Sequence, residues 1–205
     1  MTTPATPAGS TPEAGPVAKP VDDGMAGVIV ARSAICRVSP ERHGLLYRGY
    51  RCSDLAARCT FEEVAYLLMH QELPARREVN LFARAIRKWA RPLPALKKML
   101  DRLPDEAPAM DVMRTGLSAV GAFKNAHPLV TADDIRDRFH LFLGEAEMVL
   151  ALWAVRLRGV RYVGSREKSL AGRLLEYLTG AKPTAEQTDA MQTSLILYAE
   201  HGFNA

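Results

Sequence analysis

Apolar residues recur every three or four positions along most of the chain, the spacing that places them on one face of an α-helix. Thr60 followed by Glu63 forms a capping-box pattern, which predicts a helix from Phe61 to about Gln71. The same periodicity, with capping and proline signals, predicts about seven helices, preceded by a short one at 54–57. The later ones span 76–90, 96–103, 109–124, 131–157, 169–178 and 184–201.

The N-terminal part of the chain follows a different pattern. Residues 1–22 are rich in Pro, Thr, Ala and Gly and poor in large apolar side chains, which predicts a disordered tail. β-Branched runs at 27–31, 34–38 and 45–50 predict two or three short strands or extended arms, too few for a substantial sheet. The predicted fold is therefore all-α, with a few short N-terminal strands or extended arms ahead of the helices.

Hydrophobic content indicates a globular protein, with 48% hydrophobic and 24% charged residues among 205. Met148–Val155 is almost continuously apolar and lies inside the longest predicted helix, so this stretch is predicted to be buried on all sides. No window approaches about 18 uninterrupted apolar residues, and no membrane span is expected. The N-terminus has no basic-then-apolar signal sequence, which predicts a cytoplasmic protein.

Charge and cysteine usage exclude several classes of function. The net charge of +4 is a weak basic bias, and the arginines are spread along the helices rather than gathered with aromatics, so no nucleic-acid partner is predicted. Arginines such as those within 76–91 suit either solvated helix faces or an anionic small-molecule ligand. Cys36, Cys52 and Cys59 lack C-x-x-C spacing, which argues against disulfides and zinc and for small buried thiols.

The residues near the C-terminus hold the most distinctive candidate chemistry. An apolar run leads to Glu200, His201 and Asn204, the pattern of a buried helix that presents an imidazole to a site. His201 can donate to an anionic or carbonyl oxygen, or it can cap free helix carbonyls. Asn204 can orient the imidazole or begin a turn. No metal-ligand spacing, catalytic triad or paired-carboxylate site is found.

Two other positions have the same ambiguity. His70 ends a predicted helix, where a capping or surface role competes with a site role. Asp111 and Arg114 are three residues apart, so they are expected to pair on one helix face, with anion binding by Arg114 as the alternative. The remaining histidines, His43, His127 and His140, are interpreted as surface groups.

The chain from Gly24 to Ala205 resembles the N-terminal half of citrate synthases, and among them the bacterial 2-methylcitrate synthase type. Each matching segment is short, but their shared order and spacing over about 180 residues is specific. The segments are Ala26–Val30, His43–Tyr50 with Asp54–Ala56, Thr60–Leu68, Glu72–Pro74, Met110–Gly116 and Ser194–His201.

The resemblance implies a dimeric, almost all-α fold with a large and a small domain, of which 23–205 is the N-terminal part of the large domain. It implies an acyltransferase that condenses acetyl-CoA or propionyl-CoA with oxaloacetate, giving citrate or 2-methylcitrate, with no cofactor besides these substrates. His201 matches the family's acceptor-binding histidine after Tyr-Ala-Glu and is counted as catalytic. His70 matches a further substrate contact, and Asn204 is assigned to substrate binding beside them.

The sequence also departs from the family pattern. Gln71 replaces a usual glycine, Gly202 replaces a charged or polar residue, and Leu152–Arg156 replaces a patch rich in aromatics and histidines. The family's second and third histidines, catalytic aspartate, carboxylate-binding arginines and small domain would lie beyond Ala205. Groups that act as a unit lose most of their effect when one is missing, so this chain alone is expected to be inactive.

Two hypotheses therefore stay open. In the first, the chain belongs to an enzyme whose site is completed by a second, complementary polypeptide, and a homodimer is the expected family assembly. In the second, the chain is a non-catalytic fragment that pairs with a full-length paralogue, and Met148–Val155 would be exposed in its monomer. The preference for acetyl-CoA or propionyl-CoA is not set by these residues.

Overall fold

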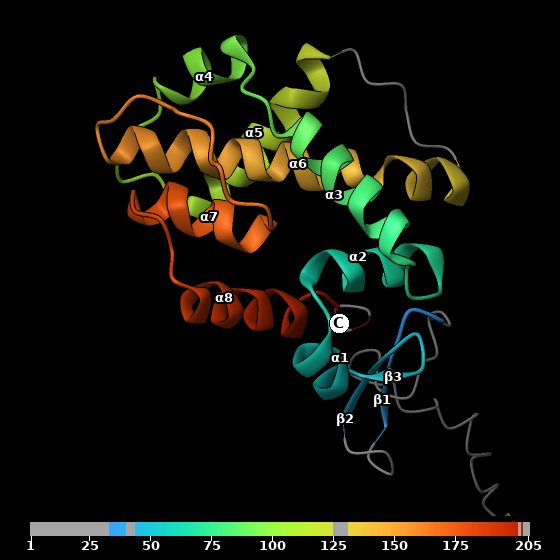
Figure 1. The fold of residues 1–205 in the computed structure, drawn as a ribbon. Coiled ribbons are helices and arrows are strands. Elements are labelled where there is room, and N and C mark those ends of the chain that lie inside the picture. The colour runs from blue at the N-terminus through green and yellow to red at the C-terminus, as the bar shows by residue number, and fades with distance from the viewer. Residues whose placement is uncertain (1–32, 40–43, 125–130, 201, 203–205) are drawn as a thin grey trace, which may run out of the picture. The chain divides into compact units, whose positions relative to one another are not determined.

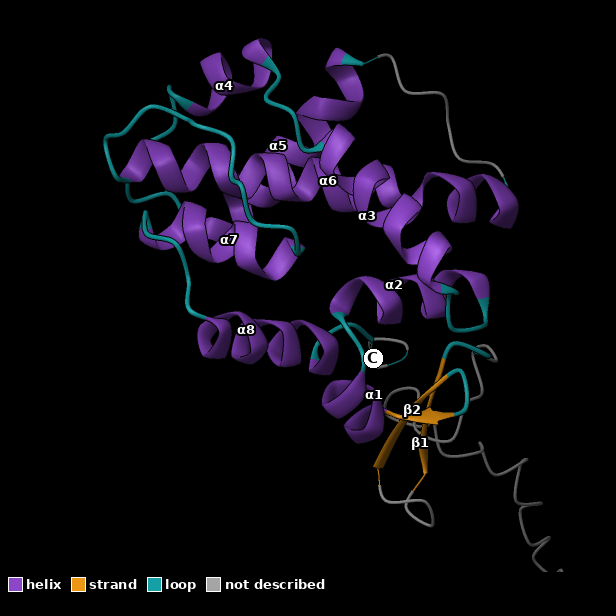
Figure 2. Ribbon diagram, viewed as in Figure 1, coloured by secondary structure: helices purple, strands orange, loops and turns teal. Residues whose placement is uncertain are grey.

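The computed structural model describes residues 33–39, 44–124, 131–200 and 202. The chain divides into two units, Met1–Arg32 and Ser33–Ala205, and all the described residues belong to the second. The predicted tail at 1–22 and the predicted strand at 27–31 lie outside the described residues. Figures 1 and 2 show helices as the main component and one small sheet.

Eleven elements make up the described part of the chain, and the all-α prediction with a few N-terminal strands is confirmed. In chain order they are β1 (Cys36–Ser39), β2 (Gly44–Tyr47), β3 (Tyr50–Arg51), α1 (Cys52–Arg58), α2 (Phe61–His70), α3 (Arg76–Trp89), α4 (Pro94–Leu100), α5 (Ala109–Phe123), α6 (Ala132–Leu157), α7 (Leu170–Thr179) and α8 (Ala185–Leu197).

The three strands form one antiparallel sheet, β1-β2-β3, where the sequence predicted too little for a substantial sheet. A two-residue turn joins β2 to β3, and both of its residues, Arg48 and Gly49, have positive φ angles of 49° and 91°. Turns of this kind match the twist of a hairpin. Because Arg51 is still paired with Leu46, α1 begins directly at Cys52, two residues before the predicted start at 54.

The capping signals placed most helix starts correctly. Thr60 accepts from the backbone N–H of Glu63, and the Glu63 carboxylate accepts from the backbone N–H of Thr60. The reciprocal pattern recurs at Thr131 and Thr184, the starts of α6 and α8. Each such cap satisfies backbone donors that a helix start leaves free, and is worth about 1 kcal/mol.

The long helix α6 lies at the centre of the helical part, with α3, α4, α5 and α7 packed around it (Figure 1). Its 26 residues correspond to a length of about 39 Å. Gly144 permits the approach of α3, because a Cβ atom there would lie 2.4 Å from the Ile86 carbonyl oxygen and 2.7 Å from the Trp89 Cβ. Within Met148–Val155 all but the half-buried Leu150 are buried, which confirms the predicted buried stretch. The alternative that a monomer exposes it is wrong, because α5 and α7 cover it.

A buried ion pair joins α6 to α7. Arg173 Nε and Nη2 donate to the two carboxylate oxygens of Glu147 at 2.6 and 2.8 Å. Arg173 Nη1 donates to the Lys168 carbonyl oxygen at 2.7 Å. Both side chains are almost fully buried, at 2% and 1% exposure, so each charge depends on the other for its stability in the interior.

Candidate functional site

The predicted site residues fall into two groups. His201 and Asn204 lie outside the described residues, so their assignment stays a prediction. His70 is described and ends α2, half-buried. Residues on both sides of position 201 are described, and their contacts define how the chain reaches the predicted site.

The Tyr47 side chain fixes the C-terminal end of α8. Its ring is fully buried, and its hydroxyl lies 3.1, 3.2 and 2.9 Å from the carbonyl oxygens of Ile196, Leu197 and Glu200. The backbone N–H of Glu200 donates to the same hydroxyl at 3.3 Å. One phenol therefore meets backbone groups at the end of a helix, where the regular hydrogen bonds run out. Of these groups, the Ile196 carbonyl oxygen also accepts from the backbone N–H of Ala199 at 3.2 Å.

A phenol has one proton, so only one of these carbonyls accepts from Tyr47 at a time. The shortest distance, 2.9 Å, is to Glu200, the residue before His201. Burial raises the pKa of Tyr47, and the neighbouring Cys52 raises it further, while the bond to the Glu200 backbone opposes the shift. The hydroxyl therefore stays protonated and remains a donor at neutral pH.

The chain turns sharply just after this contact. The backbone N–H of Gly202 donates to Glu200 Oε1 at 2.6 Å, and Gly202 has a φ of 87°. A positive φ is readily adopted only by glycine, which accounts for Gly202 where the family pattern has a charged or polar residue. One oxygen of the Glu200 carboxylate thereby accepts a hydrogen bond from the backbone of this turn.

Arg48, the residue after Tyr47, fixes the end of α2 in the same way. Its Nε and Nη2 donate to the Leu68 carbonyl oxygen at 3.0 and 2.7 Å, two residues before His70. Tyr47 and Arg48 are adjacent, with Cα atoms about 3.8 Å apart. Two neighbouring residues of one hairpin therefore hold the C-terminal ends of α8 and α2. The two histidines predicted as site residues follow directly from these two held segments.

His70 lies among aromatic side chains. Its ring stacks on Tyr66, with centroids 4.0 Å apart, and Tyr66 and His140 each meet the edge or face of Phe82. Burial lowers the pKa of His70, Arg136 lowers it further, and Asp137 and Glu78 oppose the shift. His70 is therefore favoured as a neutral imidazole, which can donate a hydrogen bond from one nitrogen and accept one at the other.

Gln71 follows His70 as the C-cap of α2, with φ 75° and ψ −6°. This is the left-handed region, in which glycine is the preferred residue and a side chain costs about 1 kcal/mol. Gln71 therefore adopts a conformation that favours the glycine of the family pattern. The backbone N–H of Gln71 still donates to the Leu67 carbonyl oxygen at 2.9 Å.

The departure at Leu152–Arg156 lies in the core and does not reach the ends of α2 or α8. Trp153 packs with Leu152 in the core formed by α4, α5 and α6. The Arg156 guanidinium stacks over the Trp153 ring at 4.6 Å and pairs with Asp105 at 2.8 Å. This patch therefore stabilises the fold.

Asp111 and Arg114 form the expected pair on α5, and both side chains are exposed. The cysteines are free, with Cys52 buried and Cys36 and Cys59 half-buried, and burial raises the pKa of Cys36 and Cys59. Over the ranges given above, no group of three or more His, Cys, Asp or Glu side chains could hold a metal ion. No helix in those ranges is long and apolar enough to span a bilayer.

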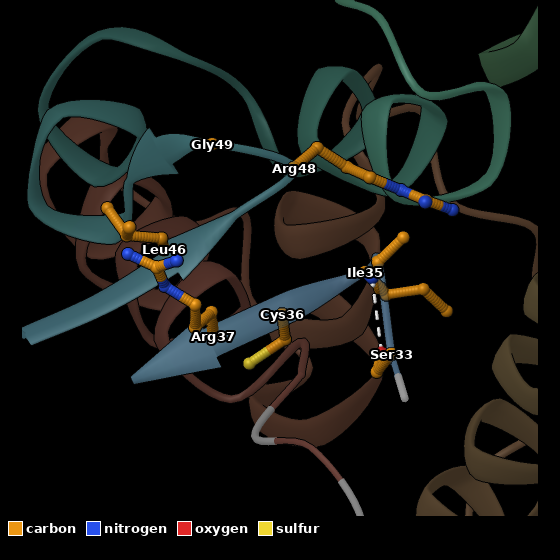
Figure 3. A pocket seen from close by; sticks show the side chains of 8 residues that line it. Ser33, Ile35, Cys36, Arg37, Leu46, Arg48 and Gly49 are labelled. Carbon is orange, nitrogen blue, oxygen red and sulfur yellow. Dashed lines mark hydrogen bonds between the residues drawn. The ribbon is translucent and has the colours of Figure 1, made fainter. Parts of the chain in front are cut away.

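A cavity of about 340 Å³ lies beside the hairpin, lined by residues that include Cys36, Arg37 and Arg48 (Figure 3). The Arg48 side chain points away from Arg37, in keeping with its bond to the Leu68 carbonyl oxygen. The two cations therefore do not converge on a shared ligand position, and we assign no binding role to this cavity.

The roles of Tyr47 and Arg48 were missed by sequence reasoning. Both belong to a segment that resembles the family, but a tyrosine in a short strand predicts packing rather than contact with a helix about 150 residues later. The available signal was the Arg48-Gly49 pair, which suits a tight hairpin turn.

Comparison with known proteins decides the family. The family model described as "Citrate synthase, C-terminal domain" matches residues 24–205. The chain belongs to the citrate synthase family. It is 37% identical over 191 residues to 2-methylcitrate synthase 2 of Corynebacterium glutamicum, covering 90% of this chain and 50% of that protein. It is 38% identical over 185 residues to the 2-methylcitrate synthase of Shewanella oneidensis, covering 89% of this chain and 48% of that protein.

Solved structures of citrate synthases have the same fold. The citrate synthase of Thermoplasma acidophilum, solved as a ternary complex with carboxymethyl coenzyme A and oxaloacetate, aligns with a TM-score of 0.79 at 23% identity. That alignment covers 87% of this chain and 47% of the archaeal one. The Thermotoga maritima enzyme aligns with a TM-score of 0.76 at 24% identity, over 90% of this chain and 48% of that one.

This citrate synthase family chain spans about half the length of the curated relatives it matches. The prediction that 23–205 is the N-terminal part of the family's large domain stays a prediction. The same holds for a disordered tail at 1–22.

Proposed function

We propose that this chain contributes the oxaloacetate-binding segment of a synthase that condenses acetyl-CoA or propionyl-CoA with oxaloacetate. The observation that carries the proposal is 37% identity to a 2-methylcitrate synthase over 90% of the chain. The Thermoplasma acidophilum enzyme, which shares the fold, was solved with a coenzyme A analogue and oxaloacetate bound, and this supports the same substrate pair.

The proposed reaction forms one carbon–carbon bond and then breaks a thioester. A carboxylate base removes a proton from the α-carbon of the acyl-CoA, and the resulting enol attacks the keto carbon of oxaloacetate. The keto oxygen gains a proton and becomes the hydroxyl of the product. Water then hydrolyses the thioester and releases the coenzyme A thiol.

His201 is proposed to bind the acceptor and polarise its carbonyl. An imidazole that donates to the keto oxygen stabilises the negative charge that develops there. The held backbone at Glu200 supports this role, because a catalytic donor needs a fixed position. His70 and Asn204 are proposed as further contacts to the acceptor, and the neutral imidazole of His70 suits a hydrogen bond to a carboxylate.

Residues 1–205 by themselves are proposed not to turn over. The resemblance assigns no residue of this chain to the base or to the donor that stabilises the enol. Release of coenzyme A thiol from acetyl-CoA or propionyl-CoA with oxaloacetate is the test. We expect no release above the blank from this chain alone, and turnover at the rate of a full-length relative would contradict the proposal.

A second proposal is that the chain pairs with another synthase chain, as a homodimer, with a complementary polypeptide or with a full-length paralogue. The supporting observation is a set of exposed apolar side chains, including Tyr198 at 86%, Val163 at 74% and Met110 at 71%. Light-scattering mass measurement with and without the paralogue separates the cases. A strictly monomeric mass under both conditions would contradict a homodimer and pairing with the paralogue, and would leave the family assignment unaffected.

A further inference from the structure

A row of cationic side chains runs along α3 and continues just beyond its end. Arg84, Arg87 and Lys88 lie on α3, and Arg91 is two residues past the last helical residue, Trp89. The spacing of Arg84 and Lys88 places these two on the same side of the helix, where like charges repel. Over the part of the chain that the structure describes, none of these four cations forms an ion pair with a carboxylate.

This row borders a cavity of about 580 Å³ between α3 and the segment that leads into α7. Five cationic residues and one carboxylate line the cavity, a surplus of four positive charges, equal to the formal net charge of the whole chain. The cations are Arg84, Arg87, Lys88, Arg91 and Arg173, and the carboxylate is that of Glu147. Because Arg173 neutralises Glu147 through two hydrogen bonds, the uncompensated charge is carried by the three α3 cations and Arg91.

The floor of the cavity is a buried, internally bonded network. The Tyr177 hydroxyl accepts from the backbone N–H of Ser165 at 3.1 Å and lies 3.1 Å from the Tyr162 hydroxyl. The two tyrosine rings stack with centroids 5.6 Å apart. Since a site on a packed support keeps its geometry when empty, the cationic wall faces a preformed surface.

Arg87 forms hydrogen bonds to the opposite wall of the cavity, the segment before α7. Its Nη2 and Nη1 donate to the carbonyl oxygens of Ser165 and Glu167 at 2.5 and 3.1 Å. These carbonyl bonds hold the segment before α7 against α3 without neutralising the guanidinium charge. Arg84, Lys88 and Arg91 are exposed, so a ligand in the cavity can reach them.

We propose that this cavity binds a pyrophosphate-bearing anion through Arg84, Lys88 and Arg91. Adjacent phosphates carry enough negative charge to offset several cations at once, whereas a single carboxylate would leave most of them uncompensated. Planar guanidinium groups also match phosphate oxygens in paired hydrogen bonds. Neither the family comparisons nor the proposed condensation assigns a role to these three residues, and the proposal does not rest on that condensation.

The test is calorimetric titration of the 205-residue chain with inorganic pyrophosphate at fixed ionic strength. The double variant Lys88→Gln/Arg91→Gln is expected to weaken binding at least about tenfold, since one hydrogen bond to a charged group is worth about that much. Arg77→Gln is the matched control, because Arg77 is exposed on the same helix but does not line this cavity. It should change the affinity less than about twofold.

Titrations with ADP and with citrate show which kind of anion the cavity binds. ADP binding as tightly as pyrophosphate, or more tightly, supports the proposal and indicates a nucleotide as the source. Weaker binding of ADP indicates free pyrophosphate and also supports it. Equal binding of citrate, an equal loss in Arg77→Gln, or no saturable binding of pyrophosphate at millimolar concentration overturns the proposal. Unfolding midpoints of each variant establish that the chain is folded during the titration.

Discussion

At the scale of single residues, Tyr47 has the largest influence on the candidate site. One buried hydroxyl meets backbone groups of Ile196, Leu197 and Glu200. Its removal would take this partner from the Leu197 carbonyl and from both backbone groups of Glu200, whereas the Ile196 carbonyl would keep the Ala199 N–H. The position of the segment before His201 therefore depends on a group that takes no part in chemistry.

Tyr47→Phe is expected to lower the free energy of unfolding by about 1–3 kcal/mol, the cost of leaving buried polar groups unpaired. Urea unfolding measures the loss, and hydrogen exchange at residues 196–200 should become faster. Tyr50→Phe is the matched control, because Tyr50 is on the same hairpin, is 44% exposed, and its hydroxyl forms no hydrogen bond with any residue that the structure describes. Equal stability of Tyr47→Phe and the wild type would show that the hydroxyl does not hold α8.

Gln71 is the second residue with a defined energetic effect. Gln71→Gly is expected to raise the free energy of unfolding by about 0.5–1 kcal/mol, because glycine adopts the left-handed conformation at φ 75° without a steric cost. Thermal and urea unfolding measure the gain. Gln71→Ala keeps a Cβ atom and should give no gain, so stabilisation by alanine as well would point to a different cause.

The sequence placed both of these residues in the right segments without revealing their roles. Gln71 was identified as a departure from the family's glycine, and the structure supplies the consequence, a strained C-cap. Tyr47 could not be assigned, because its partners are about 150 residues away and are backbone atoms, which leave no pattern in side-chain identity.

At the scale of elements, helices were predicted well because their signals are local. The Thr60–Glu63 cap, the glycine at the end of α7 and the prolines after α2 and α3 each act within four residues. The start of α1 was missed because pairing of Arg51 with Leu46 in the sheet replaced a local cap. The ion pair between Glu147 and Arg173 could not be predicted either, because it joins two separate helices and leaves no local pattern in the sequence.

Glu147→Gln is expected to destabilise the protein by about 3–5 kcal/mol, because it leaves the buried Arg173 cation without its counter-ion. Chemical unfolding monitored by circular dichroism measures the change. Asp101→Asn is the control, since Asp101 pairs with Lys97 on the surface, with both side chains 42–50% exposed, and should cost less than about 1 kcal/mol. Similar costs for the two variants would contradict the structural role of the buried pair.

Two histidines on neighbouring helices predict the dependence of stability on pH. Burial lowers the pKa of His70 and of His140. Arg136 lowers the pKa of His70 further, and His70 and Lys88 lower that of His140 further. Asp137 opposes both shifts, and Glu78 opposes the one at His70. The folded chain therefore binds fewer protons than the unfolded chain just below the ordinary imidazole pKa of about 6.5.

The free energy of unfolding should thus be at its full value above about pH 6.5 and decrease as the pH falls through the lowered folded-state values. Urea unfolding at several pH values measures the slope. The double variant His70→Gln/His140→Gln should flatten the profile between about pH 7.5 and 5.5, above the range in which ordinary carboxylates titrate. A wild-type chain that becomes more stable as the pH falls would contradict the shifts.

At the scale of the whole molecule, the hairpin connects two helix ends that are far apart in sequence. Tyr47 contacts the end of α8 and Arg48 contacts the end of α2, so the segments leading to His70 and His201 share one support. The fold class could be predicted from helical periodicity and from the family resemblance, because both are properties of the amino-acid sequence alone. The arrangement around the predicted site required the structure, because it depends on contacts across the hairpin.

Calorimetric titration with oxaloacetate tests most directly whether the end of α2 and the segment after α8 bind the acceptor. The 205-residue chain is predicted to bind oxaloacetate saturably, and His201→Ala is predicted to weaken that binding at least about tenfold, the loss of one hydrogen bond to a charged group. His127→Ala, which alters a histidine outside the predicted site, should bind as the wild type does. Absence of saturable binding, or the same affinity in His201→Ala and the wild type, would contradict the assignment.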